Sequence, residues 1–272
     1  MATASGQPVR RRRTTARGAA SAVSPVLTTL AVLAVLELLT RTDVLPRRYL
    51  PAPTTIVGEL VRQVGDGDLW TALGQTLGGW LLGLAIAIAI GVPVGLALGG
   101  SDLLWSAFRP VVEFLRPIPS VALVPLAVLT LGTGLQSKLL LAVYAAVWPL
   151  LIQAVYGIRD VDPVARETAR VYRVRGRDRF LRVTLPAVAP YLATGLRVSA
   201  TTALILTVTA ELIIGAPGLG QAVNVARQAD NPPLVYALLV VVGLLGWGLN
   251  AVLARLERRL LRWHPGRREA AR

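Results

Sequence analysis

The sequence has no cysteine, one histidine and one lysine, and these scarcities exclude several kinds of site. Without cysteine there is neither a disulfide framework nor a thiolate metal site. His264 lies in the basic C-terminal tail, so we expect no Ser-His-Asp arrangement within the fold and no histidine metal cluster. A phosphate-binding loop of the form G-x-x-x-x-G-K-[ST] is absent, because Lys138 follows Ser137 and precedes Leu139. We therefore expect no catalytic residue, no metal and no bound cofactor in this chain.

Charge is also sparse. Charged residues make up 16% of the 272 positions and hydrophobic residues 54%, which is too apolar for an ordinary soluble domain. The net charge of +14 would suggest nucleic-acid binding in a soluble protein. In a membrane protein, arginines are concentrated in the cytoplasmic loops, so the same residues indicate topology before they indicate a nucleic-acid partner. The composition therefore predicts a membrane protein with no nucleic-acid partner.

Long uncharged runs are plentiful, and a helix needs about 20 apolar residues to cross the hydrocarbon core. Five such runs contain no Asp, Glu, Lys or Arg, and a sixth apolar stretch is interrupted by Arg197 and Glu211. We predict an all-α, polytopic protein with six transmembrane helices at about 24–40, 72–99, 117–134, 137–158, 187–213 and 234–254. The membrane domain then covers residues 21–263, between a disordered basic tail at 1–20 and a second tail at 264–272.

Basic residues are distributed very unevenly about these spans. One side holds 22 of the 29 Lys and Arg, the opposite side holds six, and Arg197 lies within a span. Cytoplasmic loops carry the excess of Lys and Arg. We therefore predict that both termini are cytoplasmic.

Small residues follow a regular spacing in the second span. Gly91, Gly95 and Gly99 recur every four residues, as do two pairs nearer the start of the span, Gly74 with Gly78 and Gly79 with Gly83. This spacing places each set on one helical face and permits close approach of a neighbouring backbone. The pattern predicts that the second span packs within the helical bundle.

The third span begins with a proline-rich segment, "RPIPSVALVP". Pro117, Pro119 and Pro125 remove backbone donors, so a regular lipid-exposed helix is not expected there. Irregular backbone at membrane depth is tolerated where it lines a cavity. We expect these prolines and Ser120 to line a solute pathway, with a proline-kinked structural helix as the open alternative. Glu211, close to the outer end of its span, is a further candidate for the pathway.

The segment "ETARVYRVRGRDRFLRVTLP", residues 167–186, resembles the cytoplasmic EAA loop of ABC importer permeases. That pattern has E-A-A, a Gly six positions after the Glu, and a hydrophobic residue with Pro near nineteen positions after it. Four residues match in identity and spacing: Glu167, Ala169, Leu185 and Pro186. Thr168 replaces the first Ala, and Arg173 stands at the Gly position, so we expect Gly176 to provide the turn between two short helices. A purely topological arginine cluster would leave this spacing unexplained.

The resemblance extends over residues 45–263, to the nitrate, sulfonate, taurine and bicarbonate branch of these permeases. One segment departs from the branch: Leu131 to Gly134 replaces a run close to W-F-G-I-G. The segments that carry the resemblance are "LPAPTTIVGEL", "LRPIPSVALVPLAVLTLGTG", "GIRDVDPVARETAR", "VTLPAVAPYLATGLRVSAT", "AELIIGAPGLGQAV" and "LERRLLRW".

The resemblance implies a type I ABC importer permease (MetI-like) fold and a non-catalytic transport subunit of a bacterial cell membrane. It further implies a homodimer, a separate cytoplasmic ATPase that binds ATP and Mg, and an external solute-binding protein. The loop at 160–186 would dock into the ATPase through Glu167, Thr168, Ala169, Arg173, Gly176, Leu185 and Pro186. Small anions such as aliphatic sulfonates, taurine or nitrate are the expected substrates. A secondary transporter or channel is the alternative function.

Overall fold

The computed structural model describes residues 17–46 and 48–260. Every element within these ranges is a helix, which confirms the all-α class. The tail at 264–272, with His264, lies outside the described residues, as do residues 1–16 of the N-terminal tail. The chain divides into two compact units, residues 1–58 and 59–272, which are described separately below.

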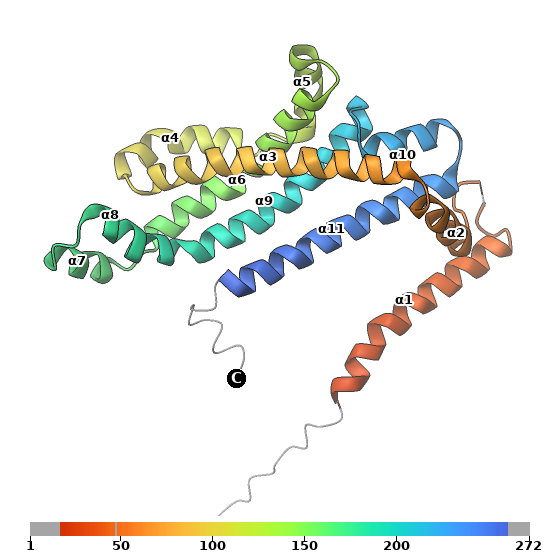
Figure 1. Ribbon diagram of the computed structural model, residues 1–272, viewed down its shortest axis with the longest axis horizontal. Helices are drawn as coiled ribbons and strands as arrows, with labels where there is room; N and C mark the ends of the chain where they lie inside the picture. Colours follow the sequence, from red (N-terminus) through yellow and green to blue (C-terminus); the bar gives the residue numbers. More distant parts are fainter. Residues whose placement is uncertain (1–16, 47, 261–272) are drawn as a thin grey trace, which may run out of the picture. The chain divides into compact units, whose positions relative to one another are not determined.

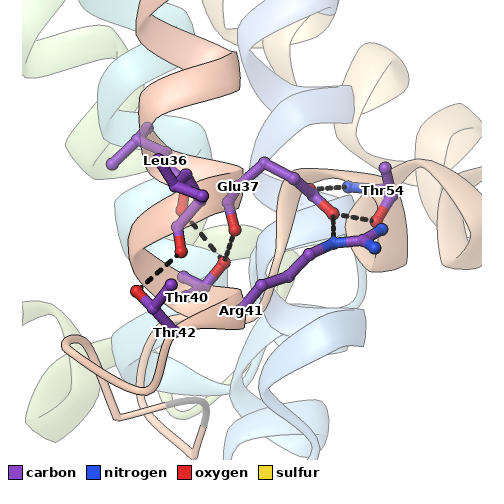
Figure 2. A network of polar contacts seen from close by, with 7 residues as sticks. Leu36, Glu37, Thr40, Arg41, Thr42 and Thr54 are labelled. Atoms are coloured by element: carbon purple, nitrogen blue, oxygen red, sulfur yellow. Dashed lines mark hydrogen bonds and ion pairs between the residues drawn. The ribbon is translucent and has the colours of Figure 1, made fainter.

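The first unit contains α1 (Arg17–Arg41) and the first turn of α2 (Pro53–Val64). α1 begins within the tail that was expected to be disordered. The Glu37 carboxylate accepts hydrogen bonds from the Thr54 backbone N–H at 3.0 Å, the Thr54 hydroxyl at 2.7 Å and the Arg41 Nε at 2.7 Å (Figure 2). An acidic group at a helix N-terminus satisfies free backbone donors and complements the helix dipole. Glu37 therefore ties the end of α1 to the start of α2.

Three long helices form the centre of the second unit: α3 (Gly67–Gly99), α6 (Leu135–Arg159) and α9 (Leu185–Ile214). They lie side by side (Figure 1), and one buried cluster joins Trp80 of α3, Leu150 of α6 and Leu204 of α9. Hydrogen bonds reinforce this packing, because the Trp80 indole N–H donates to the Ala200 carbonyl at 2.8 Å and the Ser199 hydroxyl donates to the Ala146 carbonyl at 2.6 Å.

Glycines let α3 approach α6 closely. A Cβ at Gly95 would lie 2.5 Å from the Leu151 carbonyl oxygen, and one at Gly99 would lie 2.9 Å from the Val155 Cα. Gly91 faces the Val147 carbonyl in the same way. The predicted packing face of the second span is thus confirmed for these three glycines. Gly74 and Gly78 differ, since a Cβ there would meet nothing within 4 Å.

The third predicted span is broken in two. α4 (Asp102–Leu115) ends before Pro117, and a 3-10 turn (Ser120–Leu123) leads into α5 (Val124–Leu131), bent by 81° from α4. Residues 117–119 are not helical, as expected from their prolines. The predicted span at 117–134 does not include α4, so the structure adds a helix directly before the proline-rich break.

The short helices α7, α8 and α10 lie at the two ends of the central group, and the long helix α11 runs beside it (Figure 1). α7 (Pro163–Val171) and α8 (Gly176–Arg179) lie where α6 ends and α9 begins. α10 (Leu219–Gln228) lies at the opposite end of α9, and α11 (Pro232–Leu260) follows it. Leu219 and Val223 of α10 pack in one buried cluster with Leu69 of α3 and Leu238 of α11.

Four helical stretches within the described residues are long and apolar enough to cross a membrane, or five if α4 and α5 form one bent span. They include α3, α6, α9 and α11. Each corresponds to a predicted span and extends it by a few residues. A sixth span at 24–40 and the cytoplasmic position of both termini stay predictions.

Candidate functional site

The loop that resembles the EAA motif begins with a capped helix. Asp162 precedes α7, and its carboxylate accepts a hydrogen bond from the Val164 N–H at 2.8 Å, while Pro163 occupies the first helical position. Both features are typical of helix N-termini. Ala169 is buried against the protein, whereas Glu167 and Thr168 are exposed. The sequence Asp-Pro therefore fixes where this helix starts, and Ala169 fixes which side faces inward.

The helix ends in a turn that needs left-handed backbone at one position, Arg173. Its φ is 53°, the Arg173 N–H donates to the Arg170 carbonyl at 2.9 Å, and the Val174 N–H donates to the Ala169 carbonyl at 3.0 Å. This pair of hydrogen bonds defines a Schellman motif, in which Gly is the usual left-handed residue. The expectation that Gly176 provides the turn is wrong, because Gly176 has no positive φ and begins α8. Arg173 thus adopts the conformation for which the family's Gly is suited.

The outer surface of the loop combines apolar and cationic side chains. Val164 is 66% exposed, and Val171 and Tyr172 are each 79% exposed. The surrounding arginines include Arg170 and Arg173, both exposed. Large exposed apolar side chains rimmed by charge are typical of protein-protein contact sites. The loop therefore presents a surface suited to another protein.

The C-terminal part of the loop leads directly into α9. A single π-helical turn (Phe180–Thr184) connects α8 to α9, and the expected motif residues Leu185 and Pro186 are the first two residues of α9. Both are half-buried. Arg166 donates a hydrogen bond to the Ile158 carbonyl, and the Tyr191 hydroxyl contacts the Asp160 carboxylate. The loop is thereby fastened to the ends of both α6 and α9.

A buried polar cluster lies at the other end of the central helices. The Lys138 Nζ donates to Glu211 Oε1 at 3.0 Å, and these side chains are 3% and 0% exposed. The Thr76 hydroxyl donates to Glu211 Oε2 at 2.8 Å. One cluster therefore joins α3, α6 and α9. Each charge has the partner that a buried charge requires.

The same cluster holds the loop between α9 and α10. Lys138 donates to the Pro217 carbonyl at 2.9 Å, Thr76 accepts from the Leu219 N–H at 2.9 Å, and Glu211 accepts from the Gly220 N–H at 3.1 Å. A Cβ at Gly218, whose φ is 151°, would lie 2.2 Å from the Glu211 carboxylate. The Gly-Leu-Gly sequence is required here because the backbone itself packs on the carboxylate.

This arrangement changes the interpretation of Glu211. Both of its carboxylate oxygens are engaged within the chain and its side chain is fully buried, so the geometry gives no support to the expected pathway role. No structural role for Lys138 was predicted from the sequence. The available signal was that Lys138 and Glu211 are opposite charges within apolar stretches, because charges at such positions pair with one another.

The proline-rich break lies beside two hollows. Pro117 lines a cavity of about 560 Å³ between α4 and α6, and Ser120 lines a cavity of about 300 Å³ between the break, α6 and α9. Arg116 and Ile152 line both cavities, which are therefore contiguous. Pro119 and Pro125 are exposed. The structure thus places two of the four expected pathway residues of the break, Pro117 and Ser120, beside a cavity.

Metal coordination has no candidate in the described part of the chain. No group of three or more His, Asp or Glu side chains is placed there to hold an ion.

Comparison with solved structures identifies the fold. A chain of the MetNI methionine ABC transporter in an inward-facing conformation matches with a TM-score of 0.62 and 20% sequence identity, covering 71% of this chain and 95% of that one. A second crystal form of the same transporter gives a TM-score of 0.60 over 70% of this chain and 95% of that one, at 20% identity. The expected MetI-like fold is confirmed.

Sequence comparisons identify relatives. The putative aliphatic sulfonates transport permease protein SsuC of Escherichia coli K12 is 32% identical, covering 89% of this chain and 92% of that protein. The taurine transport system permease protein TauC of the same organism is 30% identical, covering 79% and 80%. The riboflavin transport system permease protein RibX of Chloroflexus aurantiacus is 36% identical, covering 80% and 81%. Residues 87–262 match the family described as the binding-protein-dependent transport system inner membrane component, and the chain belongs to this family of ABC transporter permeases.

Proposed function

We propose that this chain is the membrane subunit of an ABC importer for small anions such as aliphatic sulfonates, taurine or nitrate. Two copies would form the pathway in a bacterial cell membrane, a cytoplasmic ATPase would bind ATP and Mg, and an external solute-binding protein would deliver the substrate. The observation that supports coupling is the exposed loop at 160–186, with its apolar and cationic surface. The names of the sulfonate and taurine relatives support the substrate class.

The loop is suited to transmit force between subunits. α7 is short, capped at its start and closed at its end by the Schellman turn, so it is a compact rigid body. Its neighbours on either side are α6 and α9, which pack closely along their length: a Cβ at Gly157 would lie 2.8 Å from Val188, and one at Gly195 would lie 3.0 Å from Gln153. A displacement of α7 by an ATPase would therefore move α6 and α9 together as a rigid body.

Copurification tests the coupling role. Glu167→Lys reverses a charge on the exposed face of α7, so the variant should lose its association with the cognate ATPase. Glu113→Lys is the matched control, because Glu113 is an exposed carboxylate of α4 with 61% side-chain exposure, outside the loop. Retention of the ATPase by Glu167→Lys, or equal loss in both variants, would contradict docking through α7.

Transport measurements separate this proposal from its alternative. A secondary transporter or channel would carry solute in proteoliposomes that contain this chain and no ATPase. An importer permease should carry none until the ATPase, ATP and the loaded binding protein are all present. Uptake without the ATPase would overturn the ABC mechanism.

The substrate class has a second candidate. The riboflavin permease is 36% identical to this chain, so an uncharged heterocycle is the alternative to a small anion. Titration of the cognate solute-binding protein with ethanesulfonate, taurine, nitrate and riboflavin decides between them. We expect saturable binding of a sulfonate and none of riboflavin.

A further inference from the structure

The smaller of the two contiguous cavities is lined by hydrogen-bond donors. Its walls combine Arg116 at the end of α4, Ser120 in the 3-10 turn and Gln153 of α6 with apolar surface from α6 and α9. We call it the Arg116 pocket and define it by its lining residues Arg116, Ser120, Ala145, Trp148, Pro149, Ile152, Gln153 and Val198. Its volume of about 300 Å³ is at the lower end of the range for small-molecule sites. The pocket suits a small solute.

The polar side chains of this pocket have no partners within the described part of the chain. Neither the Arg116 guanidinium, the Ser120 hydroxyl nor the Gln153 amide makes a hydrogen bond or ion pair with another described residue. The Trp148 indole nitrogen is buried and has no hydrogen-bond partner among the described residues. Arg116 is exposed, and Ser120 and Gln153 are half-buried. Of these four groups only the Trp148 indole N–H is a buried donor, and a buried donor without a partner costs stability. A ligand with several acceptor oxygens would satisfy them.

The pocket lies deep along α6. Trp148 is 13 residues from Leu135 and 11 from Arg159, which places it about 20 Å and about 16 Å from the two ends at 1.5 Å per residue. Arg116 is exposed and lines both contiguous cavities. Arginines within membrane helix bundles usually face a water-filled cavity and mark an ion or substrate path. Arg116 is therefore placed where a pathway residue is expected.

The sign of the charge indicates the ligand. No acidic side chain lines the Arg116 pocket, and Arg is a donor that cannot be deprotonated. Rings of Arg and Lys are typical of pores that conduct anions. The contiguous larger cavity continues this character with Arg109 and Arg159, although Glu113 also lines it and pairs with Arg109 at 2.7 Å. Arg159 is likewise paired, with Asp102 at 2.9 Å. Arg116 is therefore the arginine of the two contiguous cavities that has no acidic partner among the described residues.

We propose that the Arg116 pocket binds an oxyanion during transport, with Arg116 as the residue that selects negative charge. Ser120 and Gln153 donate to the oxygens of the ligand, and Trp148 forms the adjoining wall. This inference rests on the proposed importer function, and it assigns the permease itself a share of substrate selectivity. A sulfonate group, with three acceptor oxygens and one negative charge, fits the donor set.

Binding and transport together test the proposal. The permease is assembled with its ATPase in nanodiscs of phosphatidylcholine and titrated with ethanesulfonate at constant ionic strength, with tryptophan fluorescence as the signal. We expect a saturable change in tryptophan fluorescence on binding, and we expect this change to be absent in Trp148→Phe. Arg116→Gln, which keeps a hydrogen-bonding group but removes the charge, should weaken binding at least tenfold. Arg116→Lys should retain most of it.

Transport assays then use the same variants. Arg116→Gln should reduce sulfonate uptake at least tenfold, while the ATPase still copurifies with the variant chain. Arg227→Gln is the matched control, since it removes an arginine from the exposed face of α10 and should leave uptake unchanged. Unchanged binding in Arg116→Gln overturns the site. Loss of ATPase association in that variant overturns it as well, because the role would then be structural.

Three further outcomes are distinguishable. If ethanesulfonate binds through Arg116 while the wild-type complex imports only riboflavin, the site stands and the proposed substrate class fails. If the complex imports sulfonates but Arg116→Gln imports them equally well, the proposed function stands and the site fails. If the variant loses bound phosphatidylglycerol from mixed nanodiscs, measured by native mass spectrometry, and still binds ethanesulfonate normally, the pocket holds a lipid headgroup and the proposal is overturned.

Discussion

Arg173 adopts a left-handed backbone conformation that is usual for glycine and unfavourable for arginine. A non-glycine residue in the left-handed region costs roughly 1–2 kcal/mol, and Arg173 lies there with a φ of 53°. Arg173→Gly should therefore raise the free energy of unfolding by about 1 kcal/mol, measured by denaturant titration of the detergent-solubilised chain. If stability falls instead, the turn at 173 is held by the side chain.

The same variant separates backbone strain from charge. Arg173→Lys keeps the positive charge and the strain, so it should bind the ATPase as the wild-type chain does. Arg173→Gly removes both the charge and the strain. If this variant alone binds the ATPase more weakly, the positive charge at position 173 contributes to ATPase binding. Equal association in all three chains would exclude a charge contact at this position.

Lys138 and Glu211 form the most deeply buried ion pair in the described residues. Removal of one partner leaves an uncompensated buried charge, which costs about 3–5 kcal/mol. We expect Glu211→Leu and Lys138→Met each to lower the thermal midpoint sharply. The double variant should recover most of that loss, because no buried charge is left alone. A double variant as unstable as the sum of the single variants would contradict this account.

An exposed pair provides the control for that experiment. Arg109 and Glu113 of α4 lie 2.7 Å apart with 59% and 61% side-chain exposure. Surface ion pairs contribute about 0–1 kcal/mol. Glu113→Gln should therefore change the thermal midpoint little under the same conditions.

These residues also indicate how far sequence reasoning reaches. The match of Glu167, Ala169, Leu185 and Pro186 to the EAA spacing pattern was enough to predict the loop. The turn within it was expected at Gly176, whereas the left-handed residue is Arg173. Lys138 and Glu211 are 73 positions apart, and only the packing of α6 on α9 brings them together. A single sequence carries no signal of that contact beyond the presence of two opposite charges in apolar stretches.

At the scale of elements, the contact between α3 and α6 depends on glycine. A Cβ at Gly95 would lie 2.5 Å from the Leu151 carbonyl oxygen and 2.7 Å from the Ala154 Cβ, so the helices would have to separate. Overpacking of this kind costs about 1–3 kcal/mol. Gly95→Ala should lower the free energy of unfolding by about that amount, although alanine favours helix by about 1 kcal/mol elsewhere.

Gly78 provides the matched control within the same helix. A Cβ there would meet nothing within 4 Å, and the residue is exposed. Gly78→Ala should leave stability unchanged or raise it by up to about 1 kcal/mol through helix propensity. If both variants behave alike, close packing at Gly95 does not explain the spacing of the glycines.

The elements were predictable to different degrees. Uncharged runs located α3, α6 and α11, because length and hydropathy alone decide whether a helix can span a membrane. The same criterion did not locate α4, because Asp102, Arg109 and Glu113 interrupt its apolar sequence. Their side chains are exposed or paired at the surface, which a count of charges does not reveal.

At the scale of the whole molecule, the distribution of arginines predicts the topology. The loop at 160–186 is expected on the cytoplasmic side and α10 on the opposite side. These two elements lie at opposite ends of α9, whose 30 residues would measure about 45 Å as a straight helix (Figure 1). One membrane crossing between them is therefore the expected arrangement.

The absence of cysteine makes this arrangement directly testable. Tyr172→Cys in the loop at 160–186 and Gln228→Cys at the end of α10 each introduce a single exposed thiol. A membrane-impermeant maleimide should label Gln228→Cys in intact spheroplasts and Tyr172→Cys only in inside-out vesicles. The unmodified chain should remain unlabelled in both preparations. Labelling of both thiols from one side would mean that α9 does not cross the membrane, and the reversed pattern would place the arginine-rich loop outside, against the positive-inside rule.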